Sequence, residues 1–125
     1  MANKIYDLED RLVEFGARVI DVVEALPNMR AGNYIAGQLV RCGLAPALLY
    51  GEAQSAESRD DFVHKMKIVL KELKETRVCL KLIIKKQLIK PINRLDFLKN
   101  ECEELIKIIS KSIETSRKNN KKIPS

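Results

Sequence analysis

Residues 62–83, FVHKMKIVLKELKETRVCLKLI, carry an unbroken apolar pattern in this 125-residue chain. Apolar or small side chains recur there at alternating steps of four and three residues, which is the spacing of one face of an α-helix. These seam residues are Phe62, Met66, Val69, Leu73, Thr76, Leu80 and Ile83. Pro91 follows, and proline disfavours continuation of a helix because it has no backbone N–H. The stretch therefore predicts a long helix with one face in a core.

Two segments before this helix show the same spacing. Apolar residues recur at steps of three and four from Ile5 to Leu26, which predicts an amphipathic first helix. The second segment, residues 32–54, is apolar nearly all round, as a helix enclosed by others should be. Pro46 lies within it and removes one backbone hydrogen bond, so we expect a kink or a short break near Gly43.

A fourth segment of this kind begins at Asn93, which can cap a helix, and its apolar seam covers residues 95–109. Four amphipathic helices with short links predict an all-α fold, an antiparallel four-helix bundle formed by residues 1–116. Residues 117–125 contain almost no apolar side chains. They predict a basic, disordered tail.

The composition excludes several classes of protein. The longest nearly uncharged run, residues 34–51, contains Arg41 and is too short to span a membrane. The first ten residues are charged and lack the apolar core of a secretion signal. The three cysteines are an odd number at long spacings, which fits reduced thiols. We therefore expect a cytoplasmic protein that does not bind membranes.

The only histidine lies in residues 56–65, AESRDDFVHK, just after two acidic residues. One interpretation is a metal site made by Asp60, Asp61 and His64, but one histidine and neighbouring carboxylates are a poor ligand set. The other interpretation is a helix start, with Ser58 as the cap and the aspartates where the helix dipole favours negative charge. No serine or cysteine has an evident histidine base. We therefore expect no metal, no cofactor and no enzymatic activity.

Positive charge is concentrated in one part of the chain. Residues 1–63 carry a net charge of −4, residues 64–94 carry +8 and residues 95–125 carry +2. Such an asymmetry bears on partners and solubility. Five lysines lie opposite the core seam of the helix at residues 62–83, and four more basic residues lie in the expected tail. They are Lys67, Lys71, Lys74, Lys81 and Lys85, then Arg117, Lys118, Lys121 and Lys122.

Two interpretations of these basic residues remain open. They could follow the phosphates of RNA or another nucleic acid, each contact adding salt-dependent affinity. They could instead be the solvated face of a protein-interaction scaffold with no nucleic-acid role. No aromatic residue lies among the five lysines, so base stacking on this face is not expected.

Some apolar residues lie beside the core seams. Val13 and Ile20 lie off the first seam, and further apolar residues widen the stripe of the third helix on both sides. Those on the third helix are Ile68, Leu70, Leu82 and Ile84. A small bundle rarely needs so much apolar surface, so we expect part of it to meet another copy of the chain.

Ordered motifs on three helices resemble a known family. The second helix has Gln-Leu-x-Arg and then Glu-Ala. The third has Ser-Arg-x-Asp-Phe, then Lys, then Leu-Lys-Glu-x-x-Glu-Thr. The residues are Gln38, Leu39, Arg41, Glu52, Ala53, Ser58, Arg59, Asp61, Phe62, Lys65, Leu70, Lys71, Glu72, Glu75 and Thr76. Together with the first helix, they resemble the family of 23S ribosomal-RNA intervening-sequence proteins over about residues 5–90.

This resemblance implies an antiparallel four-helix bundle that assembles into a ring, with a pentamer as the expected form. The family has no established enzymatic activity, and some members are encoded inside insertions in ribosomal RNA genes. A related branch, the accessory proteins of diversity-generating retroelements, forms a basic ring that binds a reverse transcriptase and nucleic acid. The chain departs from the family pattern at Pro46 and Leu49, and again at Val78 and Cys79.

Arg41 lies on an otherwise apolar helix, so it must reach solvent or pair with a carboxylate. We expect Arg41, Glu52 and other acids of the motif to form a polar network, either inside the bundle or between subunits.

Overall fold

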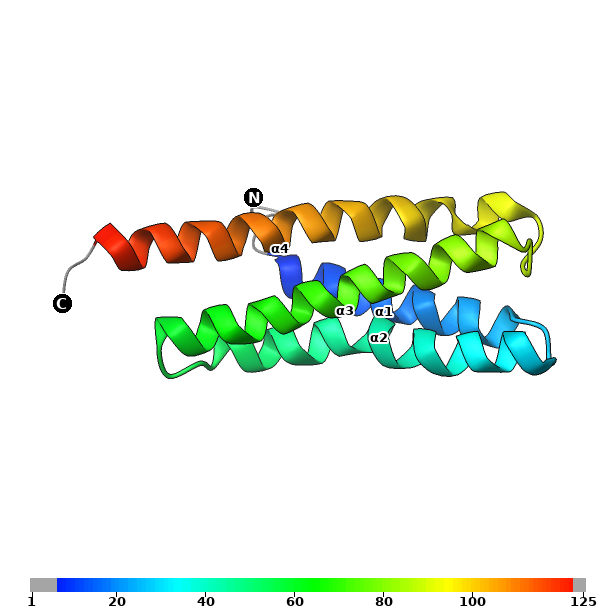
Figure 1. The fold of residues 1–125 in the computed structure, drawn as a ribbon, viewed down its shortest axis with the longest axis horizontal. Coiled ribbons are helices and arrows are strands. Elements are labelled where there is room, and N and C mark those ends of the chain that lie inside the picture. The colour runs from blue at the N-terminus through cyan, green and yellow to red at the C-terminus, as the bar shows by residue number, and fades with distance from the viewer. Residues whose placement is uncertain (1–6, 123–125) are drawn as a thin grey trace.

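The computed structural model describes the backbone of residues 7–122 and the side chains of residues 7–119. Four α-helices make up the fold: α1 Leu8–Ala25, α2 Arg30–Gln54, α3 Arg59–Lys85 and α4 Asp96–Lys122. A short 3₁₀ helix, η2 Ile92–Leu95, precedes α4 (Figure 1). No strand occurs within this described range, which confirms the predicted all-α architecture. None of the described helices combines the length and hydropathy that a bilayer span requires.

The order of packing follows the order of the chain. Each helix packs on the next one, α1 also contacts α4, and α1 and α3 lie diagonally across the bundle. Figure 1 shows the helices side by side along one long axis, with the end of α3 next to the start of α4. The outward side of α3 is therefore on the opposite side of the bundle from α1.

The seam that opened the sequence analysis forms the α3 side of the core. Its six residues from Met66 to Ile83 are buried, and Phe62, at the start of the helix, is partly buried. Thr76 is fully buried, and its hydroxyl donates to the carbonyl of Glu72 at 2.9 Å, so no polar atom of that side chain lacks a partner. The facing core residues come from α1, α2 and α4. They include Leu12, Phe15, Val19, Leu98, Cys102, Leu105 and Ile109.

A glycine allows α1 and α2 to pack closely. Gly43 is buried, and a Cβ atom at that position would lie 2.7 Å from Cγ1 of Val19. Gly16 on α1 is also buried against α2, where a Cβ would lie 3.8 Å from the Gly43 carbonyl oxygen. The two helix backbones therefore approach one another at this crossing.

Three local predictions differ from the structure. Helix α2 is continuous past the buried Pro46, so the short break expected near Gly43 is absent. The helix is packed between α1 and α3, and such tertiary contacts compensate for a lost backbone bond. Asn93 lies inside η2 and does not cap α4, because the backbone first forms a turn in which the Arg94 N–H donates to the Pro91 carbonyl.

The third difference concerns the C-terminal tail. Helix α4 continues to Lys122, where the sequence predicted a disordered tail from residue 117. Lysine and arginine are good helix formers, and no proline or glycine interrupts residues 96–122. Residues 123–125 lie outside the described part of the chain.

Candidate nucleic-acid interface

The five lysines predicted on the outer side of α3 are all exposed. We call Lys67, Lys71, Lys74, Lys81 and Lys85 the lysine row. Their steps of four, three, seven and four residues keep them on one side of the helix, over a length of about 27 Å at the usual helical rise. Val78 occupies the remaining position in this row and is 54% exposed.

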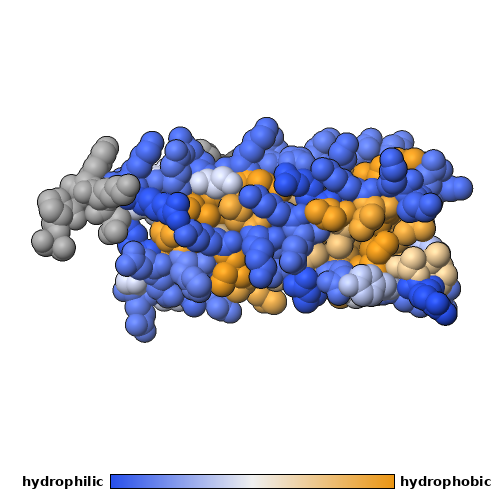
Figure 2. All heavy atoms as spheres, viewed as in Figure 1, coloured by the Kyte–Doolittle hydropathy of each residue, from blue (hydrophilic) through white to orange (hydrophobic). Residues whose placement is uncertain are grey.

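An open groove follows the first part of the lysine row. Three of its lysines lie around the groove, together with Leu70, Glu75 and Val78. The lysine ammonium groups therefore stand next to apolar surface. Figure 2 shows the same combination over the whole visible face, where apolar patches interrupt a mainly hydrophilic surface.

Two of the four acidic residues of α3, Glu72 and Glu75, are held by an arginine from α2. Arg41 Nη1 lies 3.0 Å from Glu72 Oε1, and Arg41 Nη2 lies 2.8 Å from Glu75 Oε1. The hydrogen bond that Arg41 donates to Glu75 holds the pKa of this carboxyl group below its usual value and raises the pKa of Arg41. Within the described residues, no lysine of the row forms an ion pair. The lysines of the row thus have no direct ion-pair partner, although Lys71 adds, after Arg41, to the lowering of the Glu75 pKa.

Arg41 and Glu52 are not brought together. Arg41 also donates to Gln38 at 3.4 Å, so its partners are on α3 and on its own helix. Glu52 lies 3.8 Å from Lys65, which is equally close to Asp61. The motif acids therefore form two separate groups between α2 and α3.

The basic residues of α4 have different environments. Arg117 is exposed and lies beside a hollow that it shares with residues of α3, including Lys67. Lys118 lies 3.9 Å from Glu114, one helical turn before it. The side chains of Lys121 and Lys122 lie outside the described part of the chain.

Two residues of that hollow, Arg59 and His64, were not among the predicted binding residues. Their meeting with Arg117 follows from the antiparallel course of α3 and α4, which places the start of one helix beside the end of the other. The sequence could have indicated this meeting through the length of α4. A helix that ended before residue 117 would not bring Arg117 beside the start of α3.

Two of the three cysteines meet between α2 and α3. A hydrogen bond from Cys79 lowers the pKa of the Cys42 thiol to about 7, while the same contact raises the pKa of Cys79. Cys102 donates to the Leu73 carbonyl at 3.3 Å, and burial raises its pKa to about 12. Cys42 and Cys102 are fully buried, so their thiols do not face a substrate. Helix α3 keeps His64 at its exposed first turns, away from these thiols.

No group of three or more metal-ligating side chains is found within residues 7–119. Ser58 does cap α3, since its hydroxyl accepts from the Asp61 N–H at 3.0 Å. The AESRDDFVHK stretch therefore begins a helix, as its capping pattern predicts.

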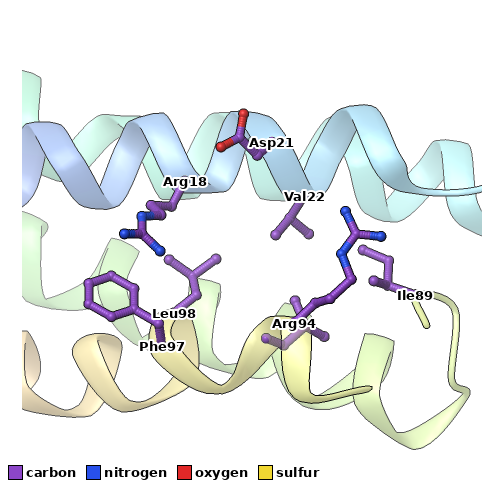
Figure 3. Close-up of a pocket in the computed structure, with 8 residues that line it drawn as sticks. Arg18, Asp21, Val22, Ile89, Arg94, Phe97 and Leu98 are labelled. Atoms are coloured by element: carbon purple, nitrogen blue, oxygen red, sulfur yellow. The ribbon is translucent and has the colours of Figure 1, made fainter. Parts of the chain in front are cut away.

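A second hollow lies between α1 and the start of α4 (Figure 3). The guanidinium group of Arg18 lies 4.1 Å from the centroid of the Phe97 ring and also pairs with Glu14 at 2.9 Å. Arg94 lies on the other side of the hollow, and Asp21 lies on α1 above it. Its apolar wall is made by Val22, Ile89, Leu95 and Leu98. Arg18 and Arg94 line this hollow together with one carboxylate, Asp21, and Arg18 is paired with Glu14 outside the lining.

Comparison with known proteins places these features in a family. A crystal structure of a protein of unknown function from the S23 ribosomal protein family of Bacteroides thetaiotaomicron VPI-5482 has a similar fold, with a TM-score of 0.78 and 29% sequence identity. The similarity covers 85% of this chain and 97% of that one. No curated protein matches the chain at a significant level. The family model of the 23S rRNA-intervening sequence proteins matches residues 6–111, and the chain belongs to this family.

Proposed function

We propose that this protein is a non-enzymatic, cytoplasmic RNA-binding protein whose lysine row follows the phosphate backbone. The observation that carries this proposal is the pairing of charges on α3. Arg41 engages Glu72 and Glu75, while the five lysines have no ion-pair partner within the described residues. A solvated face usually mixes both signs of charge, whereas the one carboxylate of the groove along the row, Glu75, is already paired with Arg41. The family name, which refers to 23S rRNA, favours RNA over other polyanions.

The residues of the row indicate how RNA would be bound. Val78 is the one interruption in the row, and no aromatic side chain lies among the lysines. Lysine is a flexible point charge, suited to phosphates and not to the reading of base edges. A duplex presents its phosphates without unstacked bases, so structured RNA is the expected partner.

Exposed apolar residues support self-association. Val13 and Ile20 on α1 are 54% and 43% exposed, and Tyr34 and Leu48 on α2 are 69% and 71% exposed. On α3, Leu82 is 47% exposed, whereas the other three residues expected at a subunit contact are partly buried. We propose that the α1 and α2 residues meet neighbouring subunits in a homo-oligomeric ring, with a pentamer as the expected form. Such a ring would present several lysine rows to one RNA, which raises the overall affinity.

The RNA proposal is tested by binding to a structured RNA over a series of salt concentrations. The test variant changes Lys71, Lys74 and Lys81 to glutamine. For the wild type we expect a steep decrease of log affinity with log salt concentration. For a duplex the slope should become shallower by up to about 0.9 for each phosphate contact that the variant loses.

A matched control changes three lysines of α4 to glutamine and removes the same charge. They are Lys99, Lys107 and Lys111, all exposed. The control should keep most of the wild-type slope. No binding by the wild type at low salt would contradict the proposal, and it would favour a protein-interaction scaffold whose lysines serve solubility.

Self-association is tested by light scattering under reducing conditions. The wild type should have a mass several times the 14.3 kDa of the chain. Replacing Val13 and Leu48 with lysine should reduce this mass, because two charges would then be buried without partners at the subunit contact. A monomeric wild type at high concentration would refute the ring.

A further inference from the structure

The hollow between α3 and α4 lies between the start of α3 and the last turns of α4, at the left end of the bundle in Figure 1. Its volume is about 300 Å³ and it is open to solvent. On the α3 side, its lining comes from the first three turns of the helix and includes Arg59, Asp60, His64 and Lys67. Ser116 and Arg117 approach it from α4. Two helices far apart in the sequence therefore surround one space.

The charges around this hollow are unequal. Arg59, Lys67 and Arg117 make no ion pair within the described residues, and Asp60 is the single carboxylate of the lining. Lys118, the neighbour of Arg117, is by contrast paired with Glu114. In the hollow between α1 and α4, by contrast, Arg18 is already paired with Glu14, and Asp21 is the carboxylate of the lining. Uncompensated positive charge is thus a property of the α3–α4 hollow.

The donors present here suit a phosphate group. A guanidinium group offers N–H donors in a planar fork that can bind two phosphate oxygens together. Arg59 and Arg117 bring two such forks from different helices, and the Ser116 hydroxyl adds another donor. Lys67 belongs both to this lining and to the lysine row, so the two surfaces are continuous.

We propose that the hollow between α3 and α4 is a phosphate site, in which Arg59 and Arg117 hold one phosphate group of the nucleic acid that follows the lysine row. This inference rests on the proposed RNA binding and extends the surface from one helix to two. The row supplies separated point charges along the backbone, while the hollow fixes one phosphate with paired donors. The position of that phosphate sets where the RNA lies along α3.

The first experiment compares two double variants that remove the same charge. One changes Arg59 and Arg117 to glutamine, and the control changes Arg30 and Arg94, which are exposed arginines at the other end of the bundle. For binding of a duplex RNA at moderate salt, we expect the first variant to lose about tenfold in affinity or more, since hydrogen bonds to charged groups are strong. The control should lose no more than about threefold through the general loss of charge.

Equal losses in the two variants would overturn the phosphate site and leave the binding of RNA by the lysine row intact. Thermal unfolding of both variants checks that neither has lost the fold.

The second experiment does not depend on RNA. Pyrophosphate is titrated into the wild-type protein and the backbone amide resonances are followed. We expect saturable shifts at Val63, Ser116 and neighbouring residues, absent in the Arg59→Gln, Arg117→Gln variant. Shifts of this kind in a protein that fails to bind RNA would support the phosphate site and contradict the proposed function. Uniform, non-saturating shifts would contradict the site itself.

Discussion

Two contacts of helix α2, one with each neighbour, differ in kind. Towards α1, the backbone of Gly43 lies against the side chain of Val19 with no room for a Cβ atom. Towards α3, the long side chain of Arg41 reaches across to Glu72 and Glu75. The first contact is made by packing and should determine stability. The second is made by charge and lies partly in solvent, so it should act mainly on the electrostatics of the surface.

The largest effect is expected from Gly43→Ala. The new methyl group would lie 2.7–2.8 Å from both γ-carbons of Val19, so α1 and α2 would have to move apart. Overpacking of this kind lowers the free energy of unfolding by about 1–3 kcal/mol. Urea denaturation followed by circular dichroism measures it as a lower midpoint.

A smaller effect of opposite sign is expected from Gly37→Ala on the same helix. A Cβ atom at Gly37 meets nothing within 4 Å. Because alanine favours a helix over glycine, this variant should raise the free energy of unfolding by about 0.5–1 kcal/mol. If both alanine variants shift the urea midpoint in the same direction, the close contact of Gly43 with Val19 does not determine the effect of the substitution.

The charged side of α2 should show its effect in binding. In Arg41→Gln, the Glu75 carboxylate loses its partner on the rim of the groove that it shares with Lys71 and Lys74. We expect a loss of about two- to fivefold in affinity for structured RNA at low salt, because a free carboxylate then offsets the lysine charges. Arg30→Gln, at an exposed arginine of the same helix, is the matched control. Equal affinities for the two variants would show that Arg41 has no specific effect on RNA binding by the lysine row.

The smallest effect is expected in the dependence of stability on pH. The pKa of Glu75 is lower in the folded protein than its unfolded value of about 4.3, because Arg41 favours the carboxylate. The stabilisation is therefore fully present above the unfolded pKa, and it is lost as pH falls through the folded pKa. The difference in urea midpoint between wild type and Glu75→Gln should thus be larger at pH 6 than at pH 3. A difference that stays constant over this range would show that the ion pair does not stabilise the fold.

The apolar spacing predicted most of the fold because burial follows helical period. Met66, Leu73 and Leu80 lie in the core as their positions along the seam require. Asn93 was assigned as a helix cap from its residue type, but a turn of 3₁₀ helix before α4 depends on how the chain leaves Pro91. Sequence spacing alone does not contain that geometry.

The site was less predictable because it depends on the register between helices. Glu52 follows Arg41 by eleven residues on one helix, which separates their backbones by about 16 Å. Arg41 could therefore have been expected to find its partners elsewhere, but the choice of Glu72 and Glu75 depends on how α2 and α3 are aligned. The same holds for Arg117, whose place opposite Arg59 and Lys67 appears only once α4 is followed to its end.

The weakest contact between neighbouring helices in the described chain, that of α1 with α4, has a consequence for the order of folding. Arg11 and Glu101, which join these helices at 2.7 Å, are 90 residues apart, whereas the other helix pairs are close in sequence. Contacts between sequence neighbours form fast and distant ones are slower, so we expect α1 to dock on α4 last and to separate from it first in native-state hydrogen exchange. The basic surface lies on α3 and α4, so it would persist through this opening.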